Sequence, residues 1–76
     1  MPLLTEDDLK QTAIRYLKTQ YHEDTVSMDI LDNGVNGGNG VLHVDCTVSV
    51  DGSHSDWIKW FTFKGGKVTN MRWQMR

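Results

Sequence analysis

The stretch DWIKWFTFKGGKVTNMRWQMR, from Asp56 to Arg76, reads as two strands joined by a tight turn at Gly65 and Gly66. Glycine accepts the positive φ angles that two-residue hairpin turns need, so these glycines predict a hairpin of strands 57–64 and 67–75. Large apolar side chains occupy both sides of this hairpin, whereas a sheet with one hydrated face alternates apolar and polar residues. The stretch therefore raises the question of what covers the second face of the sheet.

The chain before the hairpin predicts one helix and two further strands. A capping-box spacing at residues 5–8, followed by apolar residues with a 3.6-residue period, indicates a helix from about Glu6 to His22. Residues 26–30 alternate as a short strand, and residues 41–50 alternate regularly as a longer one. The glycine-rich segment 32–40 between them is expected to be a flexible loop. We therefore predict an α+β fold, in which an N-terminal helix packs on a four-stranded antiparallel meander.

The 76 residues make one domain, 1–76, near the lower size limit for a chain that folds alone. A chain of this size buries only about 60% of the surface that its unfolded form exposes. Small domains often add disulfides, a metal or a partner subunit. Cys46 is the only cysteine, which excludes an internal disulfide and a four-cysteine zinc site. We therefore expect a homodimer, in which the partner supplies the missing core.

Charge and hydropathy limit the possible partners and the location. The formal charge of −2 gives no overall attraction to nucleic acid or to an anionic membrane. No apolar run approaches the roughly 20 residues of a transmembrane helix. The start MPLLTEDDLK is acidic where a secretion signal is basic. A lone cysteine in an apolar run is typical of a core side chain in a reducing environment, so we expect a cytoplasmic protein without membrane contact.

Strand pairing decides which side chains share a face. We assume regular pairing of the last hairpin and an even number of loop residues after Val50, because an odd number would swap the faces of strand 41–50. One face, on which the helix should lie, then carries Leu42, Val44, Cys46, Val48, Trp57, Phe61, Phe63 and Val68. The outer face carries an apolar cluster of Ile58, Trp60, Met71, Trp73 and Met75. Monomers seldom expose contiguous apolar patches above a few hundred Å², so we expect this outer cluster to be the homodimer interface.

His43 and Asp45 are the strongest candidates for a polar site. They lie two residues apart on a strand and therefore share a face. A histidine beside a carboxylate can act as a base or orient a metal ligand. A hydrated strand face is the simpler explanation of the two residues, and no histidine or cysteine spacing matches a metal motif. We therefore assign no catalytic residue, no metal and no cofactor.

Two alternatives to self-association remain open. Basic residues lie beside tryptophans on the last two strands: Lys59, Lys64, Lys67, Arg72 and Arg76 with Trp57, Trp60 and Trp73. Aromatic side chains on a sheet stack against single-stranded bases while basic neighbours hold phosphate, which favours a single-stranded nucleic-acid binder. The second alternative is a small-ligand pocket between helix and sheet, lined by Tyr16, Tyr21, Phe61 and His43.

The segment FTFKGGKVTNMRW, Phe61 to Trp73, resembles the closing hairpin of the α+β group that includes cystatins and nuclear-transport-factor-like domains. The order of the elements is similar to that group over most of the chain. The resemblance implies a concave sheet crossed by a helix, and dimerisation through a sheet face. The Gln-x-Val-x-Gly hairpin of cystatin inhibitors and the extra helices of nuclear-transport-factor-like domains are both missing, so neither protease inhibition nor catalytic residues are implied. The expected function is non-enzymatic binding or assembly.

Overall fold

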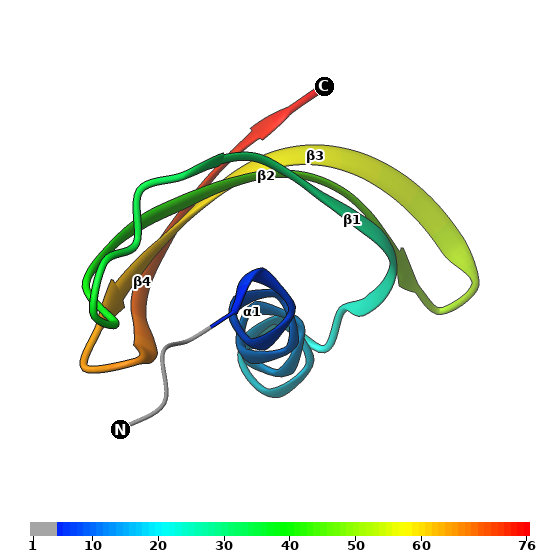
Figure 1. Cartoon of the computed structure of the whole chain (residues 1–76). Helices are drawn as coiled ribbons and strands as arrows, with labels where there is room; N and C mark the ends of the chain where they lie inside the picture. Colours follow the sequence, from blue (N-terminus) through cyan, green and yellow to red (C-terminus); the bar gives the residue numbers. More distant parts are fainter. Residues whose placement is uncertain (1–4) are drawn as a thin grey trace.

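A computed structural model describes residues 5–76 and shows one helix on one sheet. The elements are α1 (Glu6–Tyr21), β1 (Asp24–Asn33), β2 (Gly40–Val50), β3 (Ser53–Lys64) and β4 (Lys67–Met75). The four strands form one antiparallel sheet in the order β1-β2-β3-β4. The sheet curves strongly, and α1 lies in its concave side (Figure 1). This is the α+β arrangement that the sequence predicts.

Helix α1 begins and ends where local hydrogen bonds define its limits. The Asp8 backbone N–H donates to Thr5 Oγ1 (3.1 Å), and the Thr5 N–H donates to Asp8 Oδ2 (2.9 Å). The hydrogen bond from the Thr5 backbone N–H lowers the pKa of the Asp8 carboxyl below its ordinary value, and the Thr5 hydroxyl lowers it further by a smaller amount. The helix ends at Tyr21, one residue before the predicted end, because His22 adopts a left-handed conformation (φ 55°). Within residues 5–76, no helix has the length and apolarity needed to cross a membrane.

The core lies between α1 and the concave side of the sheet. The helix contributes Leu9, Ala13 and Leu17, which are buried. The strands contribute the buried residues Met28, Leu42, Val44, Cys46, Val48, Phe61, Phe63 and Met71. The predicted core face of β2 and β3 is therefore confirmed, with Trp57 and Val68 partly buried at its margin.

The turn between β2 and β3 fixes the register of these two strands. Asp51 and Gly52 form a two-residue turn with positive φ angles of 52° and 82°, and Val50 pairs with Ser53 across it. The loop is therefore even, as assumed, although β3 begins earlier than the sequence suggests. The consequence is that the apolar residues of β2 lie on the same face as Phe61.

The glycine-rich loop between β1 and β2 is anchored at its tip to the turn between β3 and β4. The Gly66 N–H donates to the Gly38 carbonyl (3.0 Å), and the Gly65 N–H donates to Asn39 Oδ1 (3.0 Å). A Cβ at Gly38 would lie 2.7 Å from the Gly66 nitrogen, so only glycine permits this approach. These contacts explain Gly38 as a structural residue.

The pairing of β3 with β4 differs from the regular pairing that the sequence suggests. The two residue pairs beside the Gly65-Gly66 turn form as expected, but Thr62 then pairs with Asn70. Thr69 is left as an extra residue in β4, which makes a β-bulge, and its hydroxyl lies 3.4 Å from the Thr62 carbonyl. Because side chains alternate with a period of two, this bulge moves every later β4 side chain to the opposite face.

The predicted outer cluster is therefore wrong as a single surface. Met71, Trp73 and Met75 lie on the concave side, paired with Phe61, Lys59 and Trp57. Ile58 and Trp60 remain on the convex side, paired with Gln74 and Arg72. The bulged register is favoured over regular pairing because it buries Met71 in the core and leaves the polar residues of β4 in water.

Deleting Thr69 is expected to leave the fold and its faces unchanged. The deletion removes the extra residue, so Asn70 still meets Thr62, and we expect the free energy of unfolding to change by at most about 1 kcal/mol. The indole resonance of Trp73 in a ¹H–¹⁵N spectrum should keep its position. Deleting Ile58, which pairs without a bulge with Asp45 on β2 and with Gln74 on β4, is the matched control and should unfold the protein. A large shift of the Trp73 resonance on deleting Thr69 would contradict the bulge.

Candidate functional site

A pocket of about 200 Å³ lies between the end of α1 and the strands β3 and β4. Its lining residues, which we call the aromatic pocket, are Tyr21, Glu23, Trp57, Lys59, Met71 and Trp73. The bulge in β4 creates this site, because it turns Met71 and Trp73 toward the helix. Of the residues predicted to line a pocket between helix and sheet, only Tyr21 does so. Phe61 belongs to the core, Tyr16 packs against that core, and His43 lies on the convex side.

The polar wall of the aromatic pocket is an ion pair. Lys59 Nζ donates to Glu23 Oε1 at 2.6 Å, and the two side chains are 3% and 16% exposed. The ammonium also lies 5.6 Å from the centroid of the Trp57 ring, within the range of a cation–π interaction. Glu23 directly follows the C-cap of α1, where its N–H donates to the Leu17 carbonyl (3.2 Å). The helix end therefore holds the carboxylate over a lysine that the sheet buries.

A series of aromatic rings connects the core to the rim of the pocket. Tyr16 packs edge-on against Phe61 and against Tyr21, with ring centroids 6.3 Å and 5.9 Å apart. Tyr21 in turn packs edge-on against Trp73, at 6.2 Å. Edge-to-face pairs of this kind stabilise the folded state by more than the burial of their surface area alone. Burial, and then the neighbouring Tyr21, raise the pKa of the Tyr16 hydroxyl above its ordinary value.

His43 and Asp45 share the convex face, as predicted, but each has a different partner. The His43 ring stacks on Trp60, with centroids 4.9 Å apart and an interplanar angle of 10°. The Arg72 guanidinium lies on the same indole, with Cζ 5.9 Å from the ring centroid. Asp45 instead binds Arg76. The two residues therefore do not combine into the His–carboxylate site that their spacing suggested.

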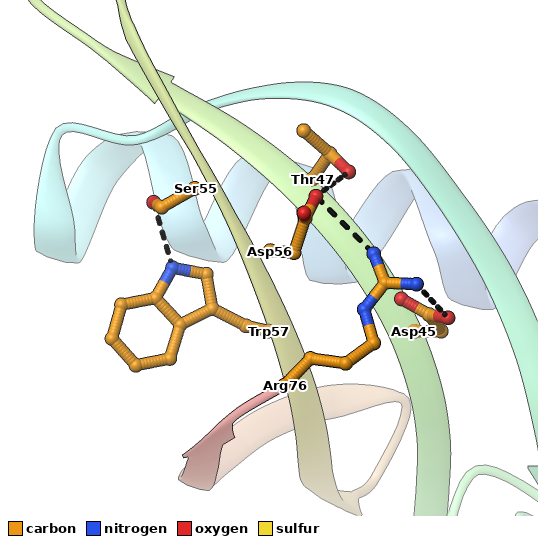
Figure 2. Close-up of polar contacts among 6 residues, drawn as sticks. All are labelled: Asp45, Thr47, Ser55, Asp56, Trp57 and Arg76. Atoms are coloured by element: carbon orange, nitrogen blue, oxygen red, sulfur yellow. Dashed lines mark hydrogen bonds and ion pairs between the residues drawn. The ribbon is translucent and has the colours of Figure 1, made fainter.

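Arg76 closes a polar network on this convex face. Figure 2 shows its guanidinium between two carboxylates, with Nη1 3.1 Å from Asp45 Oδ2 and Nη2 3.2 Å from Asp56 Oδ1. Asp56 also accepts a hydrogen bond from Thr47 Oγ1 at 2.6 Å. The Thr47 hydroxyl, with Arg76, holds the pKa of the Asp56 carboxyl below its ordinary value. This network fastens the end of the chain across β2 and β3.

Trp57 lies on the other side of β3 from this network. Its Nε1–H donates to Ser55 Oγ at 2.9 Å, as Figure 2 shows. The indole N–H is therefore occupied, and the ring offers the pocket an apolar surface. Sequence reasoning placed Trp57 on the core face correctly but did not identify it, Lys59 or Glu23 as parts of a site.

The aromatic and basic residues considered for nucleic-acid binding do not form one surface. Lys59 is buried against Glu23, and Arg76 is paired with two aspartates. Trp60 lies on the convex side, whereas Trp57 and Trp73 line the pocket on the concave side. Single-strand binding uses rings beside cations on one face, and Trp60 beside Arg72 is such a pair on the convex side, so nucleic-acid binding stays a prediction.

The metal and thiol chemistry of the described chain is limited. Across residues 5–76, no group of three or more histidine, cysteine, aspartate or glutamate side chains is placed to hold a metal ion. Cys46 is buried in the core, and burial raises the pKa of its thiol from 9.0 to about 11. The thiol therefore serves as a small apolar core residue.

The raised pKa of Cys46 predicts a loss of stability in alkaline solution. Between pH 9 and 11 the unfolded thiol loses its proton while the folded one keeps it, so the free energy of unfolding falls as the pH rises through this range. Below pH 9 both states hold the proton and the thiol has no effect. Urea titrations from pH 8 to 11 should show this decline in the wild type and less of it in Cys46→Ala. Equal pH profiles for the two proteins would contradict the assignment.

Comparison with known proteins yields no relative for this chain. No family model matches it, and no curated protein or solved structure is similar enough to count as a match. The resemblance to cystatin-like and nuclear-transport-factor-like domains therefore stays a prediction from the order of the elements and the closing hairpin. The geometry of the aromatic pocket is the basis for a proposal of function.

Proposed function

We propose that this chain is a non-enzymatic small-ligand-binding domain and that the aromatic pocket is its binding site. The observation that carries the proposal is the Lys59–Glu23 ion pair, which forms the polar wall of a cavity otherwise lined by aromatic and apolar side chains. Ligand sites in proteins combine a mostly apolar lining with a few fixed polar groups in this way. The volume of about 200 Å³ suits a ligand of one ring, since a cavity of about 150 Å³ holds benzene.

The ion pair supports binding because folding alone does not require it. Replacing a buried ion pair by apolar side chains of similar size is often neutral or stabilising, so such pairs are weak evidence for a stability role. This pair also borders a cavity and an exposed rim. A role in ligand recognition accounts for both features.

Small aromatic probes test this proposal through the three tryptophans. Trp57 and Trp73 line the pocket, whereas Trp60 lies on the convex side and serves as an internal control. We expect toluene and 2-pyridone, added to ¹⁵N-labelled protein, to shift the indole resonances of Trp57 and Trp73 and to leave that of Trp60 unchanged. No shift at millimolar concentrations, or an equal shift of all three, would overturn the proposal.

The matched variant for this experiment is Met71→Trp. Met71 lies at the inner side of the pocket and is buried, so a larger side chain there fills the cavity without changing the ion pair. We expect this variant to keep its circular dichroism spectrum and to lose the shifts at Trp57 and Trp73. A variant that still binds the probes would place the binding site elsewhere.

Self-association is the second candidate, and the rim of the pocket favours it. Tyr21, Trp73 and Met75 are 40%, 55% and 68% exposed on the concave side, and we call them the rim patch. Tryptophan and tyrosine are enriched at interface hot spots. A domain of this size buries a smaller fraction of its own surface than a larger domain does, so a second copy of the chain is the partner that we propose for the rim patch.

Sedimentation equilibrium distinguishes the two candidates. A dimer built on the rim patch should dissociate in the variant Trp73→Arg and persist in Trp60→Arg, which changes the convex side. A wild-type monomer at 100 micromolar would exclude self-association and leave the ligand proposal intact.

We further place the domain in the cytoplasm, which its single, unpaired cysteine supports.

A further inference from the structure

The ion pair in the aromatic pocket has hydrogen-bonding capacity that the protein does not use. An ammonium has three N–H donors, and a carboxylate has two oxygens that accept hydrogen bonds. Lys59 Nζ donates to Glu23 Oε1, and within residues 5–76 no protein group donates to Glu23 Oε2. The pocket therefore offers a donor and an acceptor next to each other, from a lysine that is 3% exposed and a glutamate that is 16% exposed.

The charges of the pair restrict the net charge of the ligand. Lys59 and Glu23 neutralise each other, and both are largely removed from water. An anionic ligand would approach the Glu23 carboxylate, and a cationic one would approach the Lys59 ammonium. Either ligand would add a charge that the neutral pair does not compensate, beside a lysine that is removed from water, and such a charge is unfavourable. The site therefore favours an uncharged ligand.

The remaining lining restricts the shape of the ligand. Trp57, Trp73 and Tyr21 present ring surfaces, and Met71 closes the inner side. Aromatic walls favour flat partners that stack or pack edge-on. The volume of about 200 Å³ accommodates one ring with small substituents.

We propose that the aromatic pocket binds an uncharged, flat ring that carries an N–H donor and a C=O acceptor side by side, as a lactam or cyclic amide does. The N–H donates to Glu23 Oε2, and the C=O accepts from Lys59 Nζ. This inference rests on the proposed function, because it names the ligand class of the same pocket. It assigns Glu23 and Lys59 as the residues that determine specificity.

A probe series on the wild-type protein tests the ligand class. The probes are 2-pyridone, N-methyl-2-pyridone, which lacks the N–H donor, and toluene, benzoate and benzylammonium, which are apolar, anionic and cationic. Dissociation constants come from the shifts of the Trp57 and Trp73 indole resonances. We expect 2-pyridone to bind at least about tenfold more tightly than each of the others, since one hydrogen bond to a charged group contributes about 1.5–3 kcal/mol.

The outcomes separate this inference from the proposed function. If toluene or N-methyl-2-pyridone binds as tightly as 2-pyridone, the ligand class is wrong although the pocket binds ligands. If benzoate or benzylammonium binds most tightly, the charge argument is wrong. If no probe shifts Trp57 and Trp73, both proposals fail. The double variant Glu23→Leu/Lys59→Met gives a second measurement, in which the preference for 2-pyridone over toluene should disappear while toluene binding persists.

Discussion

Replacing Glu23 with leucine is expected to lower the free energy of unfolding by about 3–5 kcal/mol, the usual cost of removing one partner from a buried ion pair. The reason is that Lys59, whose side chain is 3% exposed, loses the carboxylate 2.6 Å from its ammonium. The remaining charge lies in the interior, 5.6 Å from the centroid of the Trp57 ring. Urea unfolding, followed by circular dichroism, measures the change.

The matched variants are Lys59→Met and the double variant Glu23→Leu/Lys59→Met. The single lysine replacement should cost less than Glu23→Leu, because Glu23 is more exposed than Lys59 and its carboxylate can turn toward water. The double variant should recover most of the lost stability, since two apolar side chains of similar size replace the pair without an unpaired charge. A double variant as unstable as Glu23→Leu alone would contradict the account of the pair.

Replacing Phe61 with alanine is expected to cost about 3–5 kcal/mol, the range for removing a large buried aromatic side chain. Phe61 is fully buried on the concave face, between Leu42 on β2 and Met71 on β4, and it packs edge-on against Tyr16. A 76-residue domain has a total stability of about 4–11 kcal/mol, at about 0.05–0.15 kcal/mol per residue. The variant should therefore be largely unfolded in mild denaturant, which thermal and urea unfolding measure.

Trp60→Ala is the control for this replacement, because it changes the neighbouring residue of the same strand. Trp60 lies on the convex side, partly buried between His43 and Arg72. We expect this control to cost less than half as much as Phe61→Ala. If the control is the more destabilising of the two, the core lies on the other face of β3, contrary to the structure.

The sequence predicts the elements and most of the core because local signals determine them. A capping box marks the start of α1, and the regular alternation of β2 identifies its apolar face. The two-residue Asp51-Gly52 turn sets the register of β3, so that Phe61 lies on the same face as the apolar residues of β2. These signals act over a few residues, so periodicity and turn chemistry reveal them.

The register of β4 is not predicted, because one residue decides it. The Gly65-Gly66 turn fixes only the first two pairs, and the bulge at Thr69 then exchanges the two faces. The two consecutive polar residues Thr69 and Asn70, between Val68 and Met71, are the signal that regular pairing overlooked. A bulge there lets both Val68 and Met71 face the core. The predicted outer cluster is wrong as a single surface for this reason.

The polar part of the site is not predictable for a different reason. Lys59 stands at a core-facing position, which signals that a buried acid must accompany it. The partner, Glu23, lies 36 residues earlier, just beyond the C-cap of α1. Only the packing of the helix end against β3 brings the two together. A single sequence offers several acidic residues for this role and does not distinguish among them.

The face of the sheet that carries Trp73 is the central point of this account, because the pocket, the rim patch and the ligand class all depend on it. A two-dimensional nuclear Overhauser spectrum of the wild-type protein measures it directly. We expect cross-peaks between the Trp73 indole and the Tyr21 ring, whose centroids lie 6.2 Å apart. Cross-peaks from the Trp73 indole to the Ile58 side chain, without any to Tyr21, would place Trp73 on the convex side and contradict the account.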